Sequence, residues 1–470
     1  MSCTLRFALL ALAASGAAGF PSLAAQGITT AAVSGVVTDS VGQPIESAQI
    51  QVANQATGVK TYAVTRTNGN YYVQGVEVGG PYVISVRRIG FAPDSVTGVR
   101  LSLGQNFRAS FKLHTQATQL AVVTVRATSD TLSNQISPSR RGVQTDISDT
   151  ALRRLPTLNR SFTDFLSLTP QVMQAQNAGL SAGGQNNRFN NIQIDGASES
   201  DMFGLGTTGQ PGGQARGRSI SLEAVQEYQV LLSPFDVRQG NFTGALINAV
   251  TKSGTNEFHG SAYYYFRNQD LAADVPLLRA SDFEQKQFGF SLGGPIVKDR
   301  IHFFVAPEWQ REAYPAPGPF PGFTGSGPAS AADAATVQRM ADILQNTYGL
   351  NAGAAGSVSN TNPLTNIFGR LDFVLPYNSR LVLRDNYGKA ELDTLFRTST
   401  QFRFGSNAYS FNNKKNAAVA QLFTNWNNGA NNELFLGYTT IRDVRPPNAD
   451  FPSITVNTGI TGTLIAGAES

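Results

Sequence analysis

The most regular feature of the sequence is a period of two in its hydrophobic and polar positions, and it first appears in residues 29–115. Ile50 and Val52 alternate with glutamines there, and several later segments repeat the pattern. Such alternation is typical of strands that bury one face. Turn residues separate about seven of these segments, and Asn68-Gly69 predicts a type I′ hairpin turn. Residues 29–115 are therefore expected to form a compact antiparallel β-sandwich.

A second region of alternation begins at Asn256 and continues to residue 470. Phe288, Phe290 and Leu292 alternate there with polar or small residues. About eight segments of roughly ten residues repeat the pattern, as expected for a transmembrane β-barrel with apolar residues toward lipid and polar residues toward the lumen. Periodicity alone equally allows a large soluble sandwich. Aromatic residues at strand ends favour the barrel.

The segment between these regions, 146–254, has a mixed pattern that predicts short helices and short strands. Serines that resemble helix caps precede two of its apolar segments. An α+β domain is therefore expected. The helices are predicted at 162–168, after Ser161, and at 222–228, after Ser221, and the strands at 192–194, 229–232 and 244–251.

Residues 1–25 have the features of a secretory signal peptide. Arg6 gives a positive start, an apolar alanine-rich run follows over 7–20, and small residues precede position 26. The apolar run is shorter than the ~20 residues that span a bilayer. Cys3, inside this segment, is the only cysteine of the chain. Disulfides, zinc–cysteine sites and thiol catalysis are therefore excluded for the remainder.

The composition narrows the function classes further. Charged residues make up 14% of the chain, against about 25% in ordinary soluble proteins. The net charge is +4 and no run of basic residues occurs, so nucleic-acid binding is not supported. No apolar run of ~18 residues follows the signal segment, so a membrane could be crossed only by a closed β-barrel.

Two short motifs resemble enzyme signatures but lack the required context. Residues 179–183 spell G-x-S-x-G and residues 204–209 spell G-x-G-x-x-G, yet both lie in loops rich in glycine and amides. A nucleophile elbow and a phosphate loop each need a strand before and a helix after the motif. The three histidines, His114, His259 and His302, are far apart in sequence. We therefore expect no enzyme, no cofactor and no metal site.

Longer motifs add a family resemblance. Gly35–Asp39 and Thr67–Tyr71 lie within 29–115, Asn191–Gly196 lies within 146–254, Asn248–Gly260 crosses the boundary near 256, and Gly293–Arg300 lies within 256–470. On these motifs, residues 33–92 resemble the carboxypeptidase-regulatory-like (carbohydrate-binding-like) sandwich. Residues 158–267 resemble the plug and plug–barrel junction of Oar-like TonB-dependent receptors.

The resemblance implies a mainly β protein of several domains. It would consist of a β-sandwich of the carbohydrate-binding-like type, an α+β plug domain and a partial antiparallel transmembrane β-barrel. The expected boundaries are a signal peptide at 1–25, the sandwich at 29–115, a Ton-box candidate and linker at 117–145, the plug at 146–254 and the start of the barrel at 256–470.

The resemblance also implies a function. The protein would be a receptor and transporter of the bacterial outer membrane, with its sandwich in the periplasm. It would bind an extracellular oligosaccharide, peptide or siderophore and import it with energy from TonB and its inner-membrane complex. TonB would add to an extended segment by strand pairing. The uncharged, β-prone residues Leu120, Ala121, Val122, Val123, Thr124 and Val125 are the candidate Ton box, although they could also be a last sandwich strand.

Candidate substrate contacts lie in the polar part of the plug: Gln185, Asn186, Asn187, Arg188, Asp195 and Asp201. Plain plug loops without ligand contact are the alternative for these residues. A non-transporting adhesin and a secreted carbohydrate-binding protein are the alternative functions. About eight barrel strands are also fewer than the ~22 of plugged transporters, so we expect the chain to be the N-terminal part of a longer barrel.

Overall fold

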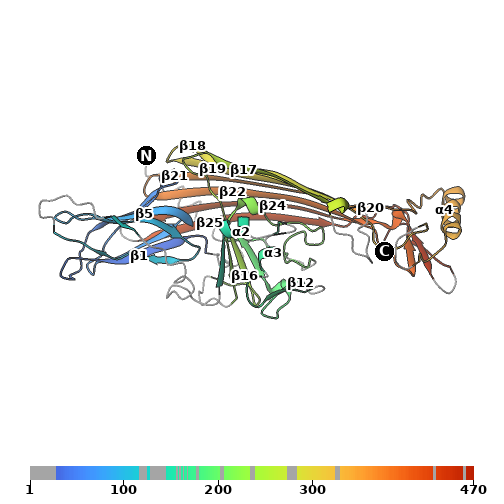
Figure 1. Ribbon diagram of the computed structural model, residues 1–470, viewed down its shortest axis with the longest axis horizontal. Helices are drawn as coiled ribbons and strands as arrows, with labels where there is room; N and C mark the ends of the chain where they lie inside the picture. Colours follow the sequence, from blue (N-terminus) through green and yellow to red (C-terminus); the bar gives the residue numbers. More distant parts are fainter. Residues whose placement is uncertain are drawn as a thin grey trace, which may run out of the picture.

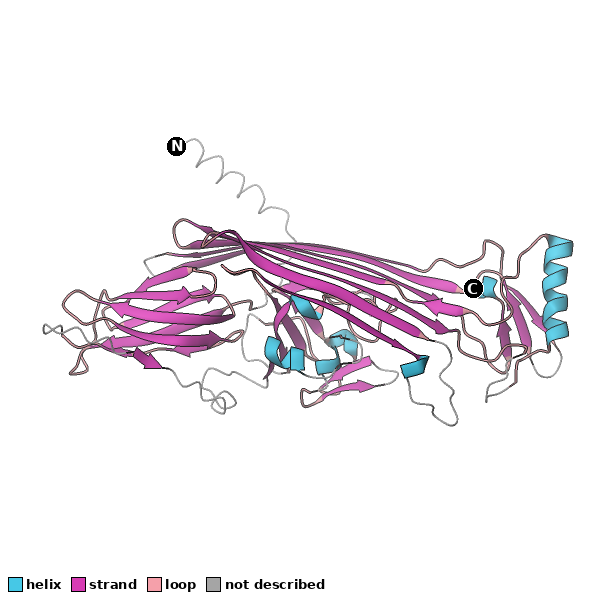
Figure 2. Ribbon diagram, turned by 45° about the horizontal axis from the view of Figure 1, so that its top comes forward, coloured by secondary structure: helices cyan, strands magenta, loops and turns pink. Residues whose placement is uncertain are grey.

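The computed structural model places a β-sandwich, a long-stranded curved sheet with a plug against it, and a small α/β module along one long axis (Figures 1 and 2). The signal-peptide prediction lies outside the described residues. Within the described residues, no helix is long and apolar enough to cross a membrane. The structure describes residues 28–115, 124–126, 144–154, 157, 160–161, 163–166, 168–175, 179–201, 206–232, 239–271, 283–322, 329–426, 430–458 and 462–469.

The sandwich consists of two sheets that enclose one apolar core. Alternate residues of its strands point inward, and Val33, Ile50 and Ile84 are fully buried. The sandwich expected from the alternation is therefore confirmed, but it is not antiparallel throughout, because β1 pairs in parallel with β7 and β8. One sheet has the order β4-β1-β7, with β8 also paired to β1, and the other has the order β3-β2-β5-β6-β9. The strands are β1 Ala31–Thr38, β2 Gln49–Asn54, β3 Lys60–Val64, β4 Asn70–Val76, β5 Gly79–Arg87, β6 Asp94–Leu101, β7 Asn106–Arg108, β8 Phe111–Lys112 and β9 Thr124–Arg126.

The type I′ hairpin predicted at Asn68-Gly69 is wrong. Strands β3 and β4, on either side of it, belong to different sheets, and of the two residues only Gly69 has a positive φ, of 72°. The Asn68 side chain instead accepts a hydrogen bond from the Asn70 amide at 3.1 Å. That contact closes an Asx turn, a use of Asn-Gly that does not require paired strands. The turn passes the chain from one sheet to the other.

Gly69→Val is expected to destabilise the sandwich. A Cβ at residue 69 would lie 2.5 Å from the Val37 carbonyl oxygen, and a β-branched residue is strained at this φ. We expect a loss of about 1–3 kcal/mol, which for a domain of this size lowers Tm by at least ~4 °C. Thermal unfolding of residues 28–115 measures it, with the open position Gly42→Ala as the control for positive φ alone. An equal Tm for wild type and Gly69→Val would contradict the close approach.

The central sheet is antiparallel throughout, in the order β17-β18-β19-β21-β22-β24-β25. Its burial is the reverse of that in a soluble protein, because Phe290 and Leu292 are exposed whereas Gln287 and Ser291 are buried. This is the barrel pattern expected from the alternation. The strands are β17 His259–Asn268, β18 Glu284–Val297, β19 Ile301–Pro315, β21 Leu364–Leu375, β22 Ser379–Thr394, β24 Tyr409–Asn425 and β25 Asn431–Val444, and the short β20 Ser359–Thr361 pairs with β19.

The connections of this sheet differ at its two ends. Short turns at 298–300 and 376–378 lie at the sandwich end, and longer segments connect the strands at the other end. Outer-membrane barrels have the same asymmetry, with short periplasmic turns and long extracellular loops. The strands reach 17 residues in β24, so they are longer than the roughly ten expected for the bilayer alone.

The plug is a small α+β domain that packs on the polar face of the central sheet (Figure 1). Its main sheet has the order β10-β15-β16-β13-β14, and β11 pairs with β12 in a separate hairpin. The three predicted strands are confirmed as parts of β13, β15 and β16. The elements are β10 Gln144–Ser148, α2 Asp149–Arg154, α3 Thr163–Leu166, β11 Val172–Ala175, β12 Gly179–Ala182, η2 Asn187–Phe189, β13 Asn191–Ile194, β14 Ala197–Ser198, η3 Leu222–Ala224, β15 Val225–Leu231 and β16 Leu246–Thr251.

The two helix predictions in the plug had different outcomes. The first helix exists but is limited to the four residues of α3. The second prediction, 222–228, is wrong. Ser221 does accept a hydrogen bond from the Glu223 amide, but the helical segment is the single 3-10 turn η3, and Val225 begins β15. Pairing of β15 with both β10 and β16 outweighs the cap, because it satisfies the backbone along the whole segment.

The α/β module at the far end is built from connecting segments of the central sheet and was not anticipated. Helix α4, Ala334–Tyr348, packs with a three-stranded sheet of β23 Gln401–Arg403, β26 Ile454–Asn457 and β27 Thr463–Ala466. Val337, Met340 and Leu344 form the buried stripe of the helix. The remaining 3-10 turns are η4 Gln269–Leu271 and η5 Gly405–Asn407.

Candidate functional site: the buried interface of plug and barrel sheet

The inner face of the barrel sheet and the plug share a cluster of fully buried charges. Glu199 of the plug pairs with Lys415 of β24, and its other oxygen lies 3.8 Å from Arg384 of β22. Arg384 also forms an ion pair of 3.0 Å with Asp195, which follows β13. Two carboxylates thus face two cations, so the cluster is neutral as a whole. Buried charges tolerate loss of water only when they are paired in this way.

Hydrogen bonds extend this cluster into the backbone of the plug. Asp195 accepts from the Thr251 amide at 2.9 Å and from the Thr251 hydroxyl at 2.7 Å. Asn386 of β22 donates to the Ser219 carbonyl at 2.6 Å, and Lys415 donates to the same oxygen. The barrel side chains therefore hold two separate segments of the plug in register with the sheet.

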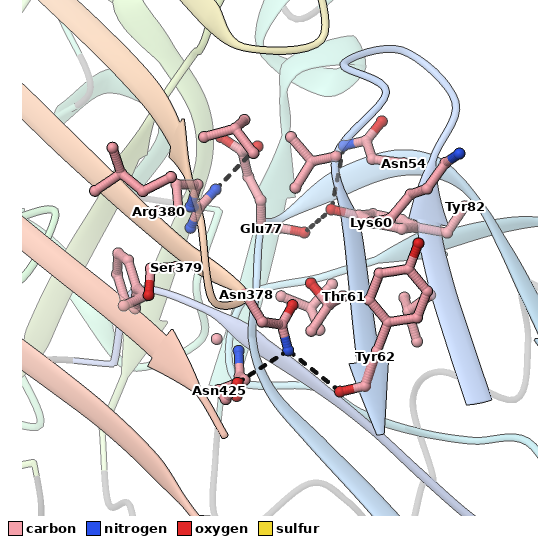
Figure 3. Close-up of a pocket in the computed structure, with 17 residues that line it drawn as sticks. Asn54, Lys60, Thr61, Tyr62, Glu77, Tyr82, Asn378, Ser379, Arg380 and Asn425 are labelled. Carbon is pink, nitrogen blue, oxygen red and sulfur yellow. Dashed lines mark hydrogen bonds and ion pairs between the residues drawn. The ribbon is translucent and has the colours of Figure 1, made fainter. Parts of the chain in front are cut away.

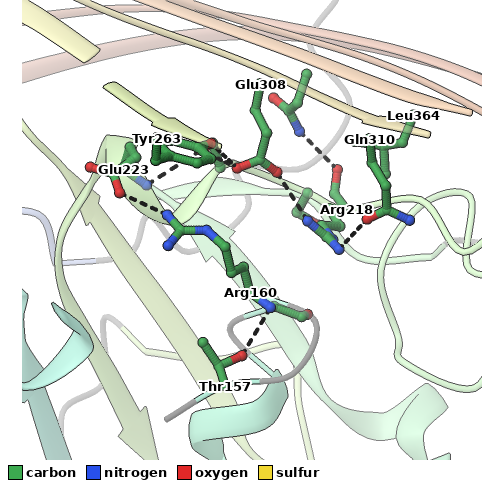
Figure 4. A network of polar contacts seen from close by, with 12 residues as sticks. Thr157, Arg160, Arg218, Glu223, Tyr263, Glu308, Gln310 and Leu364 are labelled. Atoms are coloured by element: carbon green, nitrogen blue, oxygen red, sulfur yellow. Dashed lines mark hydrogen bonds and ion pairs between the residues drawn. The ribbon is translucent and has the colours of Figure 1, made fainter. Parts of the chain in front are cut away.

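A second cluster lies around Glu308 of β19 (Figure 4). This fully buried carboxylate pairs with Arg218 of the plug at 3.0 Å and accepts from the Ser221 hydroxyl at 2.9 Å and the Tyr263 hydroxyl at 2.5 Å. Arg160 stacks 4.3 Å from the Tyr263 ring centre and pairs with Glu223. Barrel and plug thus share one polar network here as well.

The plug also contacts the sandwich through a buried carboxyl. Glu227 of β15 accepts from the Leu103 amide at 3.3 Å, and Gln229 donates to the Leu103 carbonyl at 3.0 Å. Burial, together with the nearby Asp146, raises the pKa of Glu227 to about 8, although the hydrogen bond from the Leu103 amide opposes the shift. The pKa of Glu227 therefore depends on the contact between plug and sandwich that buries its carboxyl.

The predicted substrate residues fall into two groups. Gln185, Asn186 and Arg188 are exposed, and Asn186 caps η2. Asn187 is buried and donates to the Gly206 carbonyl at 2.6 Å, and Asp201 accepts from the Gly206 amide at 2.9 Å. Asp195 faces the barrel wall in the charge cluster. The structure brings Asn187 and Asp201 together at one loop but not the full set.

The candidate Ton box is only partly described. Leu120, Ala121, Val122 and Val123 lie outside the described residues. Thr124 and Val125 belong to β9, which pairs in parallel with β6 at the edge of the sandwich. The described part of the segment is therefore a strand of the sandwich, as the alternative prediction stated.

Sequence reasoning did not identify Arg384, Lys415, Glu199 or Glu308 as interface residues. A signal was present, because each barrel charge lies among the polar positions of an alternating strand, and polar positions face the lumen. Their partners could not be read from the sequence, since Lys415 and Glu199 are 216 positions apart.

Two family models match parts of the chain. A carboxypeptidase regulatory-like domain matches residues 32–114, and an outer membrane beta barrel domain matches residues 250–319. These matches agree with the sandwich and with the first strands of the long sheet. Most of the plug lies between these two matched segments.

Two curated proteins are similar in sequence. The TonB-dependent transporter Oar of Myxococcus xanthus is 28% identical over 268 residues, which are 53% of this chain and 24% of Oar. The probable TonB-dependent siderophore receptor PirA of Acinetobacter baumannii is 26% identical over 164 residues, which are 34% of this chain and 20% of PirA. The chain thus spans about a quarter or less of the length of the curated relatives it matches.

A solved structure supports the fold. The outer membrane transporter YddB from Escherichia coli superimposes with a TM-score of 0.51 at 15% identity, over 69% of this chain and 43% of that one. At this identity the match concerns the arrangement of strands and plug. It agrees with a mainly β chain in which a plug packs inside a barrel sheet.

Proposed function

We propose, from the homology of this chain to TonB-dependent receptors of the Oar type in the bacterial outer membrane, that it binds an extracellular substrate and imports it with energy from the TonB complex. The relatives are transporters and receptors, not enzymes. The sandwich end, with its short turns, would then face the periplasm, and the α/β module would face the outside.

The observation that carries this proposal is the plug held against the polar face of the sheet by paired charges. A plug in the lumen blocks free passage, so solute movement requires the plug to rearrange. Ion pairs and hydrogen bonds suit such a role, since they fix one position of the plug beside its apolar contacts with Phe304, Ala306 and Phe368 of the sheet. A pulling force on the periplasmic side supplies the rearrangement.

The candidate substrate classes are oligosaccharides, peptides and siderophores. One relative is named a probable siderophore receptor, which makes ferric siderophores the first class to examine. The exposed residues Gln185, Asn186 and Arg188 are the proposed plug contacts, because a ligand can reach them from solvent.

An uptake screen tests the function directly. A strain that lacks the gene is compared with its parent for growth on each substrate class and for uptake of labelled compounds, with and without TonB. The account predicts a compound whose uptake is lost in both the deletion strain and the TonB-depleted parent. A non-transporting adhesin would instead show altered surface attachment with normal, TonB-independent uptake of every compound.

Val123→Pro is expected to abolish uptake while leaving the protein in the outer membrane. Proline removes a backbone donor that strand addition to TonB would need. Val123→Ala is the matched control, because it shortens the side chain but keeps the amide. Uptake by Val123→Pro is expected to fall to background and uptake by Val123→Ala to stay near wild type. Normal uptake by the proline variant would refute the Ton-box assignment.

A further inference from the structure

We propose that the sandwich restrains the plug. When the sandwich is docked, its Glu77 binds Arg370 of barrel strand β21, and Arg370 in turn binds the end of the last plug strand, β16. Undocking of the sandwich then releases β16. The sandwich would thus be a built-in restraint on plug movement, separate from the segment that TonB pulls.

Glu77 leaves the sandwich between β4 and β5 and reaches two arginines of the barrel sheet. Its carboxylate lies 2.8 Å from the Arg370 guanidinium and 3.1 Å from that of Arg380. The three side chains are largely buried, with at most 14% of the Glu77 side chain exposed. Water screens such a pair less than one on an open surface, and removal of one partner leaves buried charge uncompensated. Loss of the Glu77 charge is therefore expected to disturb the junction.

Arg370 joins all three parts of the molecule. One of its terminal nitrogens donates to Glu77 of the sandwich, and the other donates to the carbonyl of Thr251 at 2.9 Å and to its hydroxyl at 3.1 Å. Thr251 is the last residue of plug strand β16. Asp372, two residues along β21, anchors the same guanidinium at 2.7 Å. Arg370, oriented by Asp372, thus connects the sandwich to the end of the last plug strand.

The contact continues inward from Thr251. The amide and hydroxyl of Thr251 bind Asp195, and Asp195 pairs with Arg384 of the central charge cluster. One continuous polar path therefore leads from the sandwich surface to the charges that seat the plug. A change at Glu77 acts on the end of β16 first and on the cluster through it.

Further contacts place the sandwich firmly enough for this role. Asn378 of the β21–β22 turn donates to the Tyr62 carbonyl at 3.3 Å beside a cavity of about 220 Å³ at the junction (Figure 3). The Asn256 amide donates to the Ala56 carbonyl at 2.8 Å. Val78, next to Glu77, packs with Leu103 on Val250 of β16. The junction thus combines polar contacts and a cavity with one small apolar cluster, so the sandwich has a defined docked position.

The variant Glu77→Gln is expected to weaken docking without unfolding the barrel. Glutamine keeps the shape of the side chain but removes its charge, and Arg370 keeps Asp372 as a counter-charge. Arg380→Gln removes the other partner of Glu77 without touching Arg370 and serves as a second variant. Glu46→Gln, an exposed carboxylate elsewhere on the sandwich, is the matched control.

Two readouts on the whole protein in lipid separate docking from its effect on the plug. Spin labels at Val41→Cys and Tyr377→Cys, both at exposed turns, report the distance between sandwich and barrel once Cys3 is replaced by serine. Hydrogen exchange of peptides covering 246–251 reports the freedom of β16. In Glu77→Gln and Arg380→Gln we expect a longer, broader distance distribution and about tenfold faster exchange in β16, the scale of one charged hydrogen bond.

The outcomes decide the proposal without reference to transport. Glu46→Gln is expected to match wild type in both readouts. A released sandwich with unchanged exchange in β16 would show that docking does not restrain the plug. A sandwich that stays docked in both Glu77→Gln and Arg380→Gln would show that Glu77 is not the attachment point. The spin-label distance and the hydrogen exchange of β16 do not depend on transport. A negative uptake screen therefore contradicts the proposed function but not the restraint of the plug by the sandwich.

Discussion

Arg384→Met is expected to loosen the plug and to destabilise the protein by about 3–5 kcal/mol, the cost of leaving buried charge without its partner. Arg384 is fully buried and lies between Asp195 and Glu199. Its removal takes the ion-pair partner from Asp195 and leaves Glu199 with Lys415. Methionine occupies a similar volume, so the effect comes from the charge rather than from a cavity.

Urea unfolding of the protein in lipid vesicles and sensitivity of cells to antibiotics too large for ordinary porins measure these two effects. Lys389→Met on the same strand is the control, because Lys389 forms an exposed pair with Glu391, and such pairs contribute at most about 1 kcal/mol. We expect the Arg384 variant to unfold at clearly lower urea and to sensitise cells, and the Lys389 variant to do neither. Equal behaviour of the two variants would contradict the role of the cluster.

Leu383→Arg is expected to impair insertion of the barrel sheet by about 2–4 kcal/mol, the cost of an arginine at the bilayer midplane. Leu383 lies in the middle of β22, between Leu371 of β21 and Ala420 of β24, and its side chain points away from the plug. The matched control is Leu375→Arg on the same face. Both leucines are 37% exposed, but Leu375 ends β21 beside the short turn, where the cost falls to about 0–1 kcal/mol.

Folding of both variants into vesicles, followed by protease protection, measures the difference. The account expects a large loss of the protected form for Leu383→Arg and a small one for Leu375→Arg. Equal yields of the protected form would indicate that this face of the sheet does not meet lipid.

The parts of the fold that sequence predicted are those with strong local patterns. The alternation of Phe290 and Leu292 with Ser291 fixed which face of β18 meets the plug, because strand geometry sends successive side chains to opposite faces. The same rule predicted the sandwich strands around Ile50 and Ile84. Each of these inferences needed only neighbouring residues.

Other predictions of single elements were wrong or missing. In one of them, strand pairing with residues distant in sequence outweighed the local capping pattern. Ser221 does cap a turn, but sheet pairing from β10 and β16 made Val225 onward a strand. Helix α4 was overlooked, although Asp333 accepts a hydrogen bond from the Thr336 amide as a cap and Val337, Met340 and Leu344 recur at helical spacing. That pattern was present in the sequence and lies inside a region of strand-like segments.

The candidate site was the least predictable part. Asp195 was singled out as a polar plug residue, but its contact with Arg384 joins two strands 189 positions apart in sequence (384 − 195). The polar face of the barrel could be read from alternation, whereas the choice of partners depends on how the plug is seated. Only the folded arrangement gives Glu77, an ordinary sandwich glutamate by sequence, its contact with Arg370.

The most direct test of the central claim is to tether the plug to the barrel. A Cβ at Gly212 of the plug would lie 2.8 Å from Asn413 Cβ in β24, close enough that a small shift reaches the ~3.8 Å of a disulfide. Uptake of the compound found by the screen is measured for Gly212→Cys with Asn413→Cys, oxidised and then reduced, beside each single variant. The account predicts loss of uptake when oxidised and recovery on reduction. Equal uptake in the two states, with the disulfide formed, would contradict a transporter whose plug must move.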